Sequence, residues 1–154
     1  SLDYLLGPCS GGGMIGGSAI VFSDRSPATE VYAVEPVGYD DTTLSLAKGE
    51  RVQIKPGTPS FCDALLLETP GEITFAVNKE LLAGGLVVSQ AETAEAMKTA
   101  FQEYKIVVEP GGAVALAAAL SGKIMVQGSK IGVICTGGNV DAATFKDVLD
   151  GKYD

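Results

Sequence analysis

The sequence predicts an α/β fold in which a parallel sheet carries helices on both faces. Three observations lead to this fold class: short, continuously apolar runs recur along the chain, glycines stand at their ends, and stretches with helical spacing follow them. Strands that are apolar at every position are buried on both sides, and their alternation with helices is typical of parallel sheets. At 154 residues, the chain has the length of a single domain.

The expected strands are apolar or β-branched runs, and the expected helices begin after glycine, proline or polar residues. Strands are predicted over residues 2–6, 30–34, 86–88, 106–108 and 130–135. Helices are predicted over residues 14–22, 41–47, 74–82, 113–120 and 142–149, with a further helix beginning at residue 89. Ser89 and Glu92 have the spacing of a capping box at that helix start, and Ala94, Met97 and Phe101 continue at helical spacing.

The composition excludes several classes of function. The net charge is −8 and the basic residues do not cluster, so a nucleic acid is not an expected partner. The chain has no histidine, which excludes Ser-His-Asp and Cys-His catalysis and histidine-ligated zinc. Its three cysteines form no C-x-x-C pair, which favours a reducing, cytoplasmic location. The longest apolar run, residues 112–120, is too short to cross a membrane.

A glycine loop follows the first expected strand and leads into a helix. Ser10, Gly11, Gly12, Gly13 and Met14 form this loop. Successive glycines allow backbone N–H groups to turn toward one point, and the helix N-terminus adds partial positive charge, so a phosphate group is the expected ligand. The alternative is a tight strand-to-helix turn that binds nothing.

The same loop also fits a dinucleotide fingerprint. Gly11, Gly13 and Gly16 satisfy G-x-G-x-x-G, and Glu35 ends the next expected strand, where it could bind a ribose. A second glycine loop at residues 136–141 has no place in that motif. The two loops together therefore require another explanation.

Read together, the two loops and several local phrases resemble the serine/threonine dehydratase and serine racemase family of fold-type II pyridoxal-phosphate enzymes. The resemblance rests on residues 10–14 (SGGGM), 34–36 (VEP) with Asp40 and Asp41, 69–75 (TPGEITF), 107–113 (VVEPGGA) and 135–141 (CTGGNVD). Their order and spacing cover nearly all of the chain. The resemblance implies that residues 1–154 form the C-terminal segment of the large, cofactor-binding domain.

The resemblance also implies roles for individual residues. Ser10, Gly11, Gly12, Gly13 and Met14 are expected to hold the phosphate of pyridoxal 5′-phosphate, with Ser10 in place of a glycine common in relatives.

The hydroxyl of Thr136 is expected to face the pyridine nitrogen, and Glu109 is expected to have an active-site role. Glu35 and Asp41, with the backbone carbonyl of Tyr39, match a family site for a divalent cation, and oxygen ligands of this kind suit Mg²⁺ or Ca²⁺. The alternatives are a hydroxyl that caps a turn for Thr136, and solvated surface charges for the three acidic residues.

Besides Ser10, the chain departs from the family pattern in three places. Residues 62–64 read Cys-Asp-Ala where relatives often have Ala-Asp-Gly. None of the nine lysines lies in the Ser-x-Lys phrase that carries the Schiff-base lysine of the family, and the Ser-x-Gly-Asn loop for the substrate carboxylate is also missing. We therefore expect these parts, together with the small domain, to lie in an N-terminal portion that precedes this chain.

The resemblance implies a dehydratase that converts L-serine, L-threonine or a related 3-hydroxy amino acid to a 2-oxo acid and ammonia. The chain by itself is expected to be inactive, because the lysine is missing. The expected partners are the amino-acid substrate, the N-terminal portion and a second copy of the protein. A racemase of the same family, a nicotinamide-binding Rossmann domain and a regulatory binding domain are the alternatives.

Overall fold

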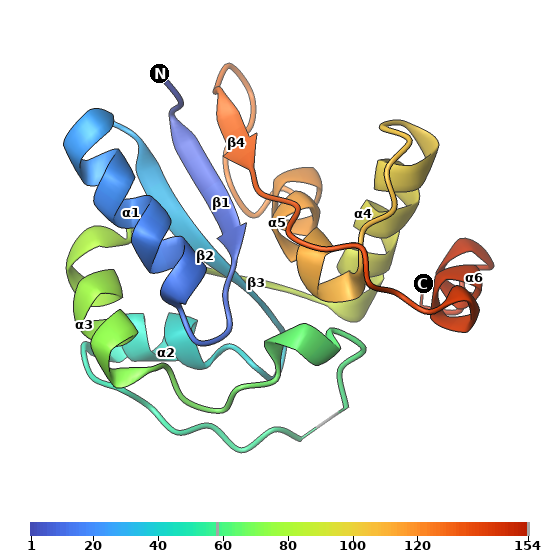
Figure 1. The fold of residues 1–154 in the computed structure, drawn as a ribbon, viewed down its shortest axis with the longest axis horizontal. Helices are drawn as coiled ribbons and strands as arrows, with labels where there is room; N and C mark the ends of the chain where they lie inside the picture. Colours follow the sequence, from blue (N-terminus) through green and yellow to red (C-terminus); the bar gives the residue numbers. More distant parts are fainter. Residues whose placement is uncertain (58, 154) are drawn as a thin grey trace.

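Four parallel strands form one sheet in the computed structural model, which describes residues 1–57 and 59–153 (Figure 1). The strands are β1 (Tyr4–Pro8), β2 (Glu30–Pro36), β3 (Gly84–Val88) and β4 (Ile131–Val133), and their order in the sheet is β3-β2-β1-β4. Every neighbouring pair is parallel. The predicted fold class is confirmed.

Helices cover both faces of the sheet, because neighbouring residues of each strand point to opposite sides. On one face, Leu5 and Ala33 belong to a core that includes residues of α1 (Gly13–Arg25). On the other face, Leu6 and Val34 pack in the core formed with α4 (Gln90–Gln102) and α5 (Pro110–Leu120). Figure 1 shows α1 and α3 (Glu72–Leu81) on one side of the strands and α4 and α5 on the other.

The helix α5 is buried along most of its length. Its residues from Pro110 to Ala118 are all buried, which agrees with its apolar composition on every side. It begins at Pro110, three residues before the predicted start at Ala113, because proline is favoured in the first turn of a helix. Gly112 lies so close to the next loop that a Cβ atom there would come within 2.8 Å of the Gly137 backbone.

Residues 106–108 were expected to form a strand, and this expectation is wrong. Ile106 and Val107 are exposed at 44% and 49%, and their segment pairs with no described strand. Lys105 has a φ of 61°, and the N–H of Ile106 bonds to the carbonyl of Ala100 at 3.1 Å, so the chain turns directly off the end of α4. The last strand is also shorter than predicted, since β4 ends at Val133.

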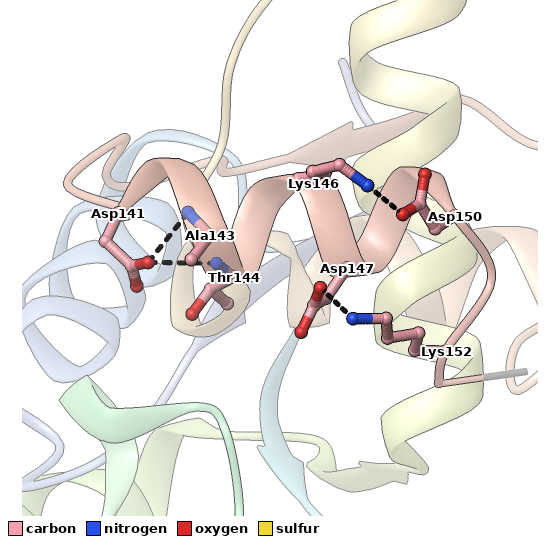
Figure 2. Close-up of polar contacts among 7 residues, drawn as sticks. All are labelled: Asp141, Ala143, Thr144, Lys146, Asp147, Asp150 and Lys152. Carbon is pink, nitrogen blue, oxygen red and sulfur yellow. Dashed lines mark hydrogen bonds and ion pairs between the residues drawn. The ribbon is translucent and has the colours of Figure 1, made fainter.

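Two short α-helices and the 3-10 turn η1 (Asp63–Leu65) complete the described part of the fold. The helix α2 (Asp41–Lys48) follows β2, and α6 (Ala142–Leu149) packs against α4, where the rings of Phe101 and Phe145 meet edge to face at 5.4 Å. Asp141 caps α6 by accepting the N–H groups of Ala143 and Thr144 at 3.0 and 2.9 Å (Figure 2). This cap fixes the point at which the second glycine loop ends and α6 begins.

Charged pairs on the exposed side of α6 add little to this arrangement. Lys146 pairs with Asp150, and Lys152 pairs with Asp147 (Figure 2). Exposed pairs of this kind contribute about 0–1 kcal/mol each. Within residues 1–57 and 59–153, no helix has the length and apolar character needed to cross a membrane.

Candidate active site

The two glycine loops meet at one cavity, beyond the carboxyl ends of β1 and β4. The cavity has a volume of about 280 Å³. Its lining consists of Pro8, Ser10, Gly11, Gly12, Gly13, Met14, Ala64, Leu65 and Thr136. This is the place where open parallel sheets bind their ligands. The structure therefore brings together the residues that the resemblance assigns to the cofactor phosphate and to the pyridine nitrogen.

The first loop requires glycine at its centre. Gly12 has a φ of 81° and stands immediately before α1, and this left-handed conformation is costly for residues that carry a Cβ atom. A Cβ atom at Gly12 would also lie 2.6 Å from Nδ2 of Asn78. The loop is thus built around a close approach between β1, α1 and α3.

The N–H groups of this loop fit a phosphate. Those of Ser10, Gly11, Gly13 and Met14 donate no hydrogen bond within the described part of the chain, while the N–H of Gly12 lies near the Cys9 thiol. The N–H groups in the first turn of any helix lack helical partners and carry partial positive charge. Free donors at the edge of a cavity are the arrangement that binds a phosphate group.

Thr136 reaches the same cavity from the other side, and Glu109 holds its loop in place. The N–H of Glu109 donates to the carbonyl of Gly137 at 2.8 Å, and the Glu109 carboxylate accepts the N–H of Asn139 at 2.9 Å. A Cβ atom at Gly137 would come within 2.7 Å of that carboxylate. Glu109 is not among the described residues that line the cavity. Its active-site role stays a prediction, and its contacts indicate that it acts by holding the Thr136 loop.

Glu35 is a buried cap for α2. Its side chain is fully buried, and its two carboxylate oxygens accept the N–H groups of Thr42 and Thr43 at 2.9 and 2.7 Å and the hydroxyl of Thr43 at 2.6 Å. Burial raises the pKa of Glu35, and these hydrogen bonds act against the rise. The solvated-surface alternative therefore does not apply to Glu35. A contact with a dinucleotide ribose is not supported either, because the carboxylate is enclosed and does not line the cavity.

Asp41 is buried as well, and one of its oxygens has no partner. Its exposed fraction is 1%, and Oδ2 accepts no hydrogen bond from the residues that the structure describes. Burial, followed by the charge of Glu35, raises the pKa of Asp41 to about 7. A hard cation would neutralise such an oxygen, so the residue fits the predicted Mg²⁺ or Ca²⁺.

The rest of the predicted cation site is less complete. Tyr39 is half-buried, and its N–H donates to the carbonyl of Pro36 at 3.0 Å, which fixes the turn between β2 and α2. Nowhere in residues 1–57 and 59–153 do three or more acidic, cysteine or histidine side chains gather as metal ligands. A cation here would be bound by Asp41, a backbone oxygen and Glu35, whose carboxylate already accepts hydrogen bonds from Thr42 and Thr43. The metal therefore stays a prediction.

Several residues at the site were not identified from the sequence. Pro8, Ala64 and Leu65 line the cavity. The unusual Cys-Asp-Ala phrase at residues 62–64 was a sequence signal for Ala64 and its neighbour Leu65, and Pro8 had none. Thr74 and Asn78 of α3 contact the glycine loop from behind. Their signal was the spacing of two polar residues four apart, which places both on one side of a helix.

A family comparison agrees with this geometry. The model for pyridoxal-phosphate dependent enzymes matches residues 1–137. This match contains the whole first loop and reaches Thr136 at the start of the second, which defines the class. The chain belongs to the family of pyridoxal-phosphate dependent enzymes.

Individual relatives include racemases and ammonia-lyases. The chain is 37% identical over 152 residues to the serine racemase of Dictyostelium discoideum, covering 97% of this chain and 47% of that protein. It is 36% identical over 154 residues to the L-threo-3-hydroxyaspartate ammonia-lyase of Saccharomyces cerevisiae, covering 99% of this chain and 47% of that protein. The chain thus spans about half the length of these relatives.

Solved structures show the same fold. Threonine deaminase isoform 2 from Solanum lycopersicum is similar with a TM-score of 0.88 and 32% identity, over 97% of this chain and 44% of that one. Maize serine racemase is similar with a TM-score of 0.85 and 34% identity, over 99% of this chain and 47% of that one. These likenesses confirm the resemblance on which the site residues were assigned.

Proposed function

We propose that the chain is the cofactor-binding segment of an ammonia-lyase that converts L-serine, L-threonine or a related 3-hydroxy amino acid to a 2-oxo acid and ammonia. The observation that carries this proposal is the cavity shared by the Ser10–Met14 loop and Thr136. One wall offers free N–H donors for a phosphate, and the other offers a neutral hydroxyl.

Pyridoxal 5′-phosphate, when bound, supplies an electron sink for the negative charge that develops at the α-carbon of an amino acid. The N–H groups of Ser10, Gly11, Gly13 and Met14 would hold its phosphate. Thr136 would offer its hydroxyl to the pyridine nitrogen. A hydroxyl would not enforce protonation of that nitrogen as a carboxylate would, and a site of this kind would suit loss of the β-hydroxyl.

The base that removes the α-proton is proposed to come from an N-terminal portion. Most of the nine lysines lie in loops or on helices at the surface, and Lys130 precedes β4 at the edge of the sheet opposite the cavity. We propose that this portion and a second copy of the protein are the partners of the chain. Racemisation begins with the same proton removal, and the similarity to serine racemases makes it the alternative activity.

The proposal is tested by combining the chain with the N-terminal portion and supplying L-serine or L-threonine. The combined protein should release 2-oxo acid and ammonia, and Thr136→Ala should lower the rate, whereas Thr99→Ala on α4 should not. Release of D-serine without 2-oxo acid would assign the racemase activity instead. Failure of Thr136→Ala to change either rate would remove Thr136 from the site.

A second experiment uses the chain alone. After incubation with pyridoxal 5′-phosphate and reduction with borohydride, mass spectrometry should find no lysine labelled in stoichiometric amounts. Turnover together with full labelling of one of the nine lysines would contradict the assignment of the base to the N-terminal portion.

A further inference from the structure

We propose that Thr74 and Asn78 of α3 are positioning residues that turn the N–H groups of the glycine loop toward the cofactor phosphate. This inference rests on the proposed function and extends it, because neither residue touches the cavity itself. Both act through the carbonyl groups of the loop.

The two side chains donate hydrogen bonds to the carbonyls of consecutive residues. The hydroxyl of Thr74 donates to the carbonyl of Gly11 at 2.5 Å, and Nδ2 of Asn78 donates to the carbonyl of Gly12 at 3.2 Å. Thr74 and Asn78 are four residues apart, so they lie on the same side of α3. That side packs against α1, which the loop opens. The loop is therefore held from behind at two successive peptide units.

The direction of a carbonyl fixes the direction of the next N–H group. A peptide unit is planar and trans, so its C=O and N–H bonds point in opposite directions. The Gly11 carbonyl bonds to Thr74 of α3, so the N–H of Gly12 faces away from that helix. The Gly12 carbonyl is held by two donors, the N–H of Gly16 in α1 at 3.0 Å and Nδ2 of Asn78, and together they direct the N–H of Gly13 the opposite way. Gly12 and Gly13 line the cavity, and none of the residues given for its lining belongs to α3.

These N–H groups remain available to an anion. The N–H of Gly13 donates to no other described residue, and the N–H of Gly12 has only the Cys9 sulfur nearby. A thiol is a weak acceptor, so this contact holds the Gly12 N–H only weakly. The two donors that α3 turns outward are thus those that a phosphate would take up.

The buried side chain of Asn78 has an incomplete set of hydrogen bonds, which lowers the stability of the fold. It is 1% exposed, its Oδ1 has no hydrogen-bond partner among the described residues, and its amide fills the space beside Gly12 and Gly16. A buried acceptor without a partner destabilises a protein, so an apolar side chain would pack better here. A buried polar group that departs from the usual rules of packing is expected at functional sites.

The test compares affinities for pyridoxal 5′-phosphate and for pyridoxal, which lacks the phosphate, using the 154-residue chain. Thr74→Val and Asn78→Leu should each weaken binding of pyridoxal 5′-phosphate by about tenfold, the effect of one hydrogen bond. Affinity for pyridoxal should not change. Thr74→Ser keeps the hydroxyl and should bind like the native chain, as should the control Thr99→Val on α4.

A ligand-free measurement keeps the test decisive if one variant folds poorly. In the absence of phosphate, the amide ¹⁵N resonance of Gly12 should move in Thr74→Val and stay in place in Thr74→Ser, because its peptide unit loses or keeps the same bond. Unmoved Gly12 resonances together with native affinity for pyridoxal 5′-phosphate would overturn the inference.

The remaining outcomes separate the inference from the proposed function. Equal weakening of pyridoxal and pyridoxal 5′-phosphate would assign Thr74 and Asn78 a purely structural role and would overturn the inference alone. A native chain that binds neither pyridoxal 5′-phosphate nor inorganic phosphate would overturn the proposed function, and the inference with it.

Discussion

Replacing Gly12 with alanine tests the construction of the glycine loop. The left-handed conformation of Gly12, with its φ of 81°, costs an L-residue about 1–2 kcal/mol. The new Cβ atom would lie 2.6 Å from Nδ2 of Asn78, so that amide must move and give up its bond to the Gly12 carbonyl. Losing this hydrogen bond adds about 0.5–1.5 kcal/mol. We therefore expect Gly12→Ala to destabilise the protein by about 2–3 kcal/mol in total.

Gly13 provides the matched control. It has no positive φ, and a Cβ atom there would have nothing within 4 Å, so Gly13→Ala should leave the free energy of unfolding unchanged or slightly higher. Urea denaturation followed by circular dichroism would measure both variants, and the melting temperature of Gly12→Ala should fall by roughly 5–10 °C. Equal stabilities for the two variants would refute the close packing of Asn78 against the loop.

Three further predictions concern the helix starts, the buried acids and the Thr136 loop. Ser89→Ala removes the acceptor of the Glu92 N–H (3.1 Å) and should lower stability in urea by about 1 kcal/mol, and an unchanged midpoint would contradict the capping box. Because the pKa of Asp41 is raised from 3.8 to about 7, its protonated form favours the folded state, and stability should fall by at most ~4 kcal/mol as the pH rises from 4 to 8. Asp41→Asn should flatten this profile, and Mg²⁺ or Ca²⁺ should raise the melting temperature at pH 8 only in the native protein. Glu109→Leu removes the acceptor of the Asn139 N–H (2.9 Å from the carboxylate) and should speed hydrogen exchange at that N–H about tenfold. Unaltered exchange would contradict the role of Glu109 in holding the loop.

The elements that depend on local pattern could be predicted from the sequence. The capping box at Ser89 and Glu92 is observed with both reciprocal bonds, because its partners are three residues apart. The strands predicted at residues 2–6 and 30–34 are observed at 4–8 and 30–36, because strands that are buried on both faces are rich in apolar residues. The resemblance assigned both glycine loops to one cofactor, and their meeting at the cavity agrees with the rule that the carboxyl ends of parallel strands share one edge.

Features that depend on distant partners could not be predicted in the same way. Residues 106–108 have the β-branched composition of a strand, but no neighbouring strand is present to bond with them. Nothing near Glu109 in the sequence indicates that its carboxylate bonds to Asn139, 30 residues further on. The contacts of Thr74 and Asn78 with the loop join residues 63 and 66 positions apart. Each of these depends on packing that only the folded chain creates.

The pairing of β1 with β4 also bears on how the chain folds. Asp3 accepts the N–H of Lys130 across 127 residues, and Leu5 lies beside Gly132 in the sheet. When a contact closes such a long loop, the chain loses much entropy before stabilising contacts form, and this slows folding. The sheet can grow through β1, β2 and β3 while Thr136 is still far from the glycine loop. Because the two walls of the cavity belong to the first and last strands, we expect the cofactor site to be among the last parts of the molecule to assemble.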